Sequence, residues 1–221
     1  MKRKILLLIC AGLALAGCVT PTRYGEPVVL TAEQRASLRA FPEGAYEMEQ
    51  SVVFTLRGRD FAGFGMTRIE ADESFASSCV TAQGMTLFEI AGQGERLDLC
   101  HTLPGIGDTA KVGAMFAECV RNVYFGNVPS PDAKWHRDYA CWVAVSALDN
   151  GDNILHCFSI DDGRLLEKHL MTRRGKIVWS ATYDDYDEIG PRRIIVHDNT
   201  QRYSYKLNLN TTNWRVAGEE P

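Results

Sequence analysis

The sequence predicts a mainly β fold with helices (α+β class): a curved antiparallel sheet, or incomplete barrel, of about eleven strands that encloses one amphipathic helix. Three observations predict it. Short β-rich segments alternate with turn-like tetrapeptides such as RGRD, TAQG and DNGD along most of the chain. One central segment has helical periodicity instead. No apolar run after the N-terminal one approaches the length of a membrane span.

Residues 1–17 are predicted to be a secretory signal peptide. Lys2, Arg3 and Lys4 form a positively charged start, residues 5–14 form an apolar core, and small residues close the segment. The core is shorter than the roughly 20 residues that cross a bilayer as a helix. We therefore expect the segment to be removed and not to remain as a membrane anchor.

The end of that segment, Leu15-Ala16-Gly17-Cys18, resembles the bacterial lipobox. The resemblance implies cleavage before Cys18 and acylation of Cys18, with palmitate as a typical acyl chain. Each buried methylene contributes about 0.8 kcal/mol, so several such chains would hold the protein on a membrane. Val19 stands where an Asp would signal retention in the inner membrane, so the sorting rule of this class implies the outer membrane, on its periplasmic face.

Residues 18–30 are predicted to be the lipidated N-terminus and a tether, because they are rich in Pro, Thr and Gly. Residues 31–221 then form one domain, which is long enough to bury a substantial core. Thr31 and Gln34 form a capping-box pattern, which predicts a short helix over residues 35–40 that ends near Pro42.

The rest of the domain is predicted as strands around one longer helix. Five strands come first, at residues 46–56, 61–69, 74–80, 85–91 and 96–100. The helix follows, because apolar residues at 112, 115, 116, 119, 120 and 123 share one helical face, and Asp108 or Thr109 can cap it. After a Pro-rich loop at 127–132, six strands are predicted at 139–148, 154–160, 165–172, 176–183, 192–198 and 203–209.

Composition and motif spacing exclude several classes of function. The balance of 24 basic and 28 acidic residues, without a basic stripe, argues against a nucleic-acid partner. The five histidines have no metal-ligand spacing, and the serines lack a nucleophile elbow, so we predict no catalytic residue, metal site or cofactor. The chain is interpreted as a non-enzymatic protein.

Seven cysteines are present, and five remain in the mature domain after Cys10 and Cys18 are set aside. The favoured interpretation is that these five are buried thiols that act as small apolar side chains. The predicted hairpins place Cys79 and Cys100 beside Thr86 on opposite neighbouring strands, about 9 to 10 Å apart. That separation is beyond the reach of a disulfide.

Apolar side chains on the first strands and the helix are the candidate ligand-binding residues. A curved sheet can hold a ligand as well as side chains, so either an apolar cavity or a packed core is compatible with them. These residues are Phe54, Phe64, Met66, Leu87, Phe88, Leu97, Leu99, Met115 and Phe116.

The order of lipobox, tether, short helix, antiparallel strands, amphipathic helix and further strands resembles the lipoprotein localisation proteins, the periplasmic carrier and its outer-membrane receptor (LolA/LolB-like). The segments FTLRGRDFAGFGMTRIE, CVTAQGMTLFEIAG and PRRIIVHDNTQRYSYKLNL carry the local likeness. The resemblance implies an incomplete barrel covered by helices that shelters acyl chains. The receptor's leucine-bearing loop has no leucine here, since the corresponding hairpin is Thr81-Ala82-Gln83-Gly84-Met85.

The predicted function is therefore that of an outer-membrane-anchored lipoprotein. It would bind acyl chains of a lipid or lipoprotein in an apolar cavity and assist their transfer or insertion at the outer membrane. Its expected partners are the membrane, that acyl cargo and envelope transport proteins. The alternative is a structural or accessory subunit of an envelope assembly or export system, with a filled core.

Overall fold

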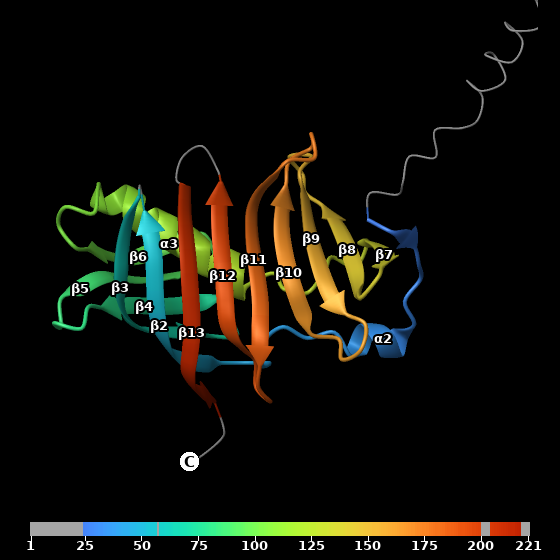
Figure 1. The fold of residues 1–221 in the computed structure, drawn as a ribbon, viewed down its shortest axis with the longest axis horizontal. Helices are drawn as coiled ribbons and strands as arrows, with labels where there is room; N and C mark the ends of the chain where they lie inside the picture. Colours follow the sequence, from blue (N-terminus) through green and yellow to red (C-terminus); the bar gives the residue numbers. More distant parts are fainter. Residues whose placement is uncertain (1–23, 57, 200–203, 218–221) are drawn as a thin grey trace, which may run out of the picture.

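The computed structural model describes residues 24–56, 58–199 and 204–217, and it confirms the predicted fold class (Figure 1). All strands of this part of the chain join one antiparallel sheet that does not close, in the order β1-β7-β8-β9-β10-β11-β12-β13-β2-β3-β4-β5-β6. The strands are β1 Glu26–Pro27, β2 Tyr46–Leu56, β3 Arg59–Ile69, β4 Ser74–Val80, β5 Thr86–Gln93, β6 Arg96–Thr102, β7 Lys134–Asp138, β8 Cys141–Ala147, β9 Asn153–Ser159, β10 Leu165–Met171, β11 Ile177–Tyr186, β12 Pro191–Asn199 and β13 Ser204–Val216. The helices are α2 Ala32–Ala36 and α3 Thr109–Tyr124.

Helix α3 occupies the concave side of the sheet (Figure 1). The Asp108 side chain accepts a hydrogen bond from the backbone N–H of Lys111 at 3.1 Å, which satisfies one of the donors left unpaired at a helix start. The helix packs mainly against β5 and β6. Its predicted apolar face is buried, including Val112, Met115 and Cys119.

Strand β2 shows why the half of the sheet formed by β2–β6 folds so regularly. Its residues alternate between buried and more exposed positions over eleven residues, so one face meets the core while the other faces outward. Phe54 is 1% exposed and contacts Phe61 and Phe116, with ring centroids 4.8 and 5.2 Å apart. Alternation and aromatic packing together fix the register of this half.

Besides β1, which lies within the predicted tether, and β13, which is longer than predicted, two elements differ from the prediction. Strand β7 occupies a segment that was not assigned, because only Trp135 among its five residues is buried, and a short, mostly polar strand carries little periodic signal. Helix α2 begins at the predicted capping box but ends at Ala36, short of residue 40. The backbone at Arg39 instead bonds to the turn between β9 and β10, so the chain cannot continue as a helix there.

Residues 37–45 form a strap that crosses the concave side of the sheet between α2 and β2 (Figure 1). The backbone N–H of Arg39 donates to the carbonyl of Gly163 at 3.0 Å, and that of Leu165 donates to the carbonyl of Arg39 at 2.9 Å. Gly163 has φ +71°, and a Cβ there would lie 2.3 Å from the carbonyl oxygen of Ser37. The close approach of the strap therefore requires glycine at this position.

The predicted register around two cysteines is wrong. Cys79 lies opposite Phe88, and Cys100 lies opposite Ile90, so they do not both lie beside Thr86. Register shifts after Cys79 and after Ala91 displace the pairing by one residue each, which hairpin positions alone could not reveal. The five cysteines of the described chain are all free thiols.

Among the described residues, no helix is both long and apolar enough to span a membrane. The predicted signal peptide, Cys18 and the first part of the tether lie outside those residues.

Candidate functional site

A groove of about 540 Å³ lies beneath the strap, beside the C-terminal end of α3. Its size is within the range of small-molecule and lipid pockets, roughly 300 to 1,000 Å³. Four parts of the chain line it: the strap with α2, the β3–β4 turn, the segment that follows α3, and the floor of the sheet. The lining residues are Arg35, Leu38–Gly44, Tyr46, Ile69–Ala71, Glu73, Tyr124–Pro131, Trp135 and Phe158.

Aromatic side chains form the inner surface of the groove. Phe41, on the strap, contacts Tyr46 and Tyr124 with ring centroids 5.9 and 5.3 Å apart. On the sheet floor, Trp135 lies 6.2 Å from Phe158. Such rings present large apolar surfaces held in fixed positions. The groove is therefore preformed and mostly apolar at its base.

Charged residues lie at the rim of the groove and differ in sign from one part of it to another. Arg35 and Arg39 come from α2 and the strap, and the Arg35 guanidinium lies 6.0 Å from the ring centroid of Trp135. Glu43 and Glu73 line the part of the groove formed by the end of the strap and the β3–β4 turn. A ligand with an anionic end would be attracted to the arginines, beside the apolar floor.

Below the groove, Lys168 of β10 holds the end of α3. Its ammonium donates to the carbonyl of Asn122 at 2.9 Å, to that of Phe125 at 2.6 Å, and to Oδ1 of Asn127 at 3.2 Å. A cation is favourable at a helix C-terminus, where carbonyls lack intrahelical partners. Burial lowers the pKa of Lys168 to about 7. This contact fixes the position of the segment that forms one wall of the groove.

His156 of β9 supports the same segment. Its Nε2 lies 2.9 Å from the carbonyl oxygen of Gly126, and its ring packs on Phe158 with centroids 6.1 Å apart. Burial, and to a lesser extent the charge of Lys168, lowers the pKa of His156 to about 4. The imidazole is therefore neutral at pH 7, with Nε2–H donating to that carbonyl.

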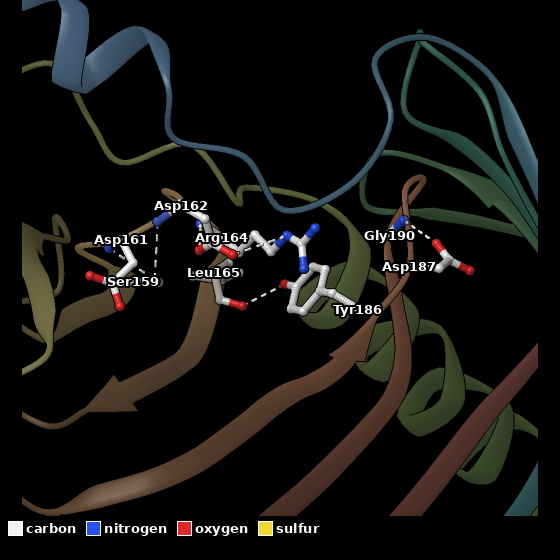
Figure 2. A network of polar contacts seen from close by, with 8 residues as sticks. All are labelled: Ser159, Asp161, Asp162, Arg164, Leu165, Tyr186, Asp187 and Gly190. Carbon is white, nitrogen blue, oxygen red and sulfur yellow. Dashed lines mark hydrogen bonds and ion pairs between the residues drawn. The ribbon is translucent and has the colours of Figure 1, made fainter.

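Figure 2 shows the polar network under the other side of the strap. The guanidinium of Arg164 lies 5.2 Å from the ring centroid of Tyr186, and the Tyr186 hydroxyl donates to the carbonyl of Leu165. Asp162 pairs with Arg164 at 3.3 Å. The strap and this network approach each other closely, because the hollow between them measures only about 20 Å³. The network thus holds the β9–β10 turn, to which the strap is bonded.

The nine candidate ligand-binding residues of the sequence prediction lie elsewhere. Phe54, Leu87, Phe88, Met115 and Phe116 are buried in the core, and Leu97 is partly buried against it, whereas Phe64, Met66 and Leu99 are exposed by 62, 47 and 43%. None of the nine lines the groove. Their predicted role in binding is untested and stays a prediction.

The space between α3 and the first strands is nearly filled. Its remaining cavity measures about 30 Å³, and of the nine candidates only Phe88 and Phe116 line it. Buried polar groups near it are paired: the Gln50 amide donates to Thr211 at 3.1 Å, and the Tyr124 hydroxyl donates to Oε1 of Gln50 at 3.2 Å. Sequence analysis did not predict the groove, because the residues that line it come mostly from segments without hydrophobic periodicity.

No protein-family model matches the chain, and no curated protein matches it by sequence. Solved structures do match at the level of the fold. A LolA superfamily protein from Nitrosomonas europaea has a TM-score of 0.54 and 12% identity, over 87% of this chain and 96% of that one. A domain of an outer membrane lipoprotein-sorting protein from Vibrio parahaemolyticus has a TM-score of 0.50 and 10% identity, over 85 and 91%.

A DUF1329 family protein from Desulfovibrio piger is similar to the same extent, with a TM-score of 0.54 and 10% identity over 86% of this chain and 91% of that one. The resemblance to lipoprotein-sorting proteins predicted from the sequence is therefore confirmed for the fold. At these identities the likeness concerns the arrangement of the strands and helix, and not the residues of a site.

Proposed function

We propose that this protein binds acyl chains of a lipid or lipoprotein in the groove beneath the strap and assists their transfer at the outer membrane. The observation that carries the proposal is the groove of about 540 Å³, whose base is aromatic and whose rim bears arginines. Its fold is shared with proteins named for lipoprotein sorting, which supports the same class of cargo.

The chemistry of the groove favours an amphiphile. An acyl chain lying along Phe41, Trp135 and Phe158 would exchange water contact for apolar contact, at about 25 cal/mol per Å² of buried surface. The polar end would then reach Arg35 or Arg39, which lie on the exposed side. Because the groove is open to solvent on that side, cargo can enter and leave without unfolding any strand of the sheet.

The proposed location follows from Cys18. Acylation there would tether the domain through the predicted tether, residues 18–30, and Val19 supports sorting to the outer membrane. Palmitate labelling of wild type and Cys18→Ser, followed by membrane fractionation, tests this anchor. We expect label and outer-membrane association only in wild type; label retained in Cys18→Ser would contradict the assignment.

One observation favours the alternative of an accessory subunit without cargo. The interior beside α3 keeps only about 30 Å³ of free space, which is too small for an acyl chain. If the groove instead receives a segment of a partner protein, fatty acids should not compete for it.

Titration of the purified full chain with a fluorescent fatty acid tests the proposal. Val128 lines the groove and is 85% exposed, so Val128→Glu should add a buried charge to the bound state only. Val29, 90% exposed and outside the groove, provides the matched control Val29→Glu. We expect saturable binding by wild type and Val29→Glu, and about tenfold weaker binding by Val128→Glu, equivalent to about 1.4 kcal/mol.

Absence of saturable uptake by the folded wild-type chain would overturn the proposal and leave the accessory-subunit alternative. Equal affinities of the two glutamate variants would show that the groove is not the site, even if lipid binds. Circular dichroism of all three proteins establishes that each is folded.

A further inference from the structure

The outer face of the sheet, opposite α3, carries a cluster of metal-ligating side chains that the proposed lipid site does not use. The ligand atoms of Cys157, Glu167 and His169 all lie within 4.8 Å of one another. Nε2 of His169 is 2.9 Å from Oε2 of Glu167. The thiols of Cys141 and Cys157 interact, which brings a second sulfur beside this cluster.

Strand register explains the juxtaposition. Cys157 of β9 lies directly opposite Glu167 of β10, and His169 follows two residues later on the same face. Cys157 also lies opposite Val143 of β8, so Cys141, two residues before Val143, is its diagonal neighbour on that face. Three adjacent strands therefore hold the four side chains, on a rigid surface.

We propose that Cys141, Cys157, Glu167 and His169 form a binding site for one thiophilic transition-metal ion of the zinc class. Two sulfurs, one imidazole nitrogen and one carboxylate oxygen are a ligand set that suits tetrahedral zinc. Bonds of about 2.0 to 2.3 Å to the metal place tetrahedral ligands roughly 3.5 Å apart, so Cys157, Glu167 and His169, within 4.8 Å of one another, need only small side-chain rotations. Cys141 would supply the fourth ligand from the neighbouring strand.

The surroundings of His169 support the assignment. Its side chain is 16% exposed, and its other ring nitrogen, Nδ1, is buried and has no hydrogen-bond partner among the described residues. A buried ring nitrogen without a partner is costly, and rotation of the ring toward the thiols would offer it to a metal ion. Glu167, with 47% side-chain exposure, leaves a path for the ion to enter.

A disulfide is the competing use of the two thiols, and the register disfavours it. Diagonal neighbours in an antiparallel pair have Cα atoms about 7 to 8 Å apart. Disulfides usually join Cα atoms at roughly 4.4 to 6.8 Å. A metal ion can bridge sulfurs that are too far apart to bond directly.

The position of the site gives it a structural role. Tyr24, within the predicted tether, donates from its hydroxyl to the sulfur of Met171 at 3.3 Å and belongs to the apolar cluster that includes Cys141 and Cys157. A metal ion bound across β8, β9 and β10 would clamp the strands where the tether meets the fold. We therefore expect metal binding to raise the melting temperature of the protein.

Titration of the reduced full chain with Co²⁺, and then displacement by Zn²⁺, tests the site. Wild type should bind one Co²⁺ at this cluster, with a thiolate-to-cobalt charge-transfer band, and should release protons as it binds. Cys157→Ser and His169→Gln should lose the band or bind at least about tenfold more weakly. Glu167→Gln, at a partly exposed position, provides a variant that keeps the fold if Cys157→Ser does not.

Two controls isolate the cluster. His197→Gln removes a histidine from the same row of the sheet two strands away, since His169 lies opposite Ser180 and Ser180 opposite His197. Cys100→Ser removes a half-buried thiol from the far end of the sheet. Both should bind like wild type. Equal binding by wild type, Cys157→Ser and His169→Gln would overturn the proposal, as would a Cys141–Cys157 disulfide found by mass spectrometry in the exported protein.

Discussion

The helix-covered half of the sheet, strands β2–β6, differs from the groove half, strands β7–β10, in what its two faces carry. In β2 the inner face is packed against the core and the outer face is polar or exposed. In β9 and β10 the inner face buries His156 and Lys168, and the outer face carries an apolar cluster with thiols. The comparison teaches that the first half has a regular division between core and surface, whereas β7–β10 carry the thiol cluster on one face and supply Trp135 and Phe158 to the floor of the groove on the other.

The largest expected effect lies in the helix-covered half. Phe54→Ala should destabilise the fold by about 3 to 5 kcal/mol, because it removes a ring in contact with Phe61 and Phe116 and leaves a cavity. Phe64→Ala, at a 62% exposed position of the neighbouring strand, should change stability by less than about 0.5 kcal/mol. Urea unfolding measures both. Similar losses in the two variants would show that this half is not packed as described.

In the groove half, lowering the pH should destabilise the fold through His156. Its pKa is lowered to about 4, so the unfolded chain binds more protons than the folded one between pH 6.5 and 4. Stability should fall as pH falls through this window, by on the order of 3 kcal/mol. Urea unfolding at several pH values, for wild type and His156→Gln, checks this. A slope in the variant as steep as in wild type would assign the effect to other groups.

Lys168 should contribute somewhat less to the stability of the fold than His156. Lys168→Met leaves the carbonyls of Asn122 and Phe125 without their donor, at a cost of about 1 to 3 kcal/mol. Lys176→Met, at an exposed position, is the matched control and should be nearly neutral. Thermal unfolding compares them. A neutral Lys168→Met would mean that burial of the charge costs as much as its hydrogen bonds contribute.

Gly163→Ala should have the smallest effect on stability and a selective effect on the groove. The added Cβ meets the strap at the Ser37 carbonyl, so we expect a loss of about 1 to 2 kcal/mol, a displaced strap and weaker fatty-acid binding. Gly84→Ala provides a control, since Gly84 also has a positive φ but has open space around its Cβ position. Unchanged fatty-acid affinity in Gly163→Ala would separate the strap from the site.

The sequence predicted the regular half well because alternation and turn residues act locally. The predicted bounds of the strand at 46–56 match those of β2 at both ends. The N-cap of α3 is Asp108, one of the two residues that we predicted for it. Alternation could also have separated Phe61 from Phe64, which are three residues apart and so point to opposite faces. The last strand was predicted to end at residue 209 but continues to Val216, paired with β2.

The groove and the thiol cluster could not be predicted in the same way, because tertiary pairing creates them. The strap, the turn before β4 and the segment after α3 have no periodicity that would place them together. Cys141, Cys157 and His169 come from three strands, and their spacing has meaning only once the register is known.

Photo-cross-linking with a diazirine-bearing fatty acid, followed by peptide mapping, tests the central claim most directly. The claim is that cargo occupies the groove beneath the strap and not the interior beside α3. We predict saturable cross-links to the groove residues Phe41, Val128 and Trp135, which excess unlabelled fatty acid removes. Cross-links confined to Phe88, Met115 or Phe116, or none that saturate, would contradict it.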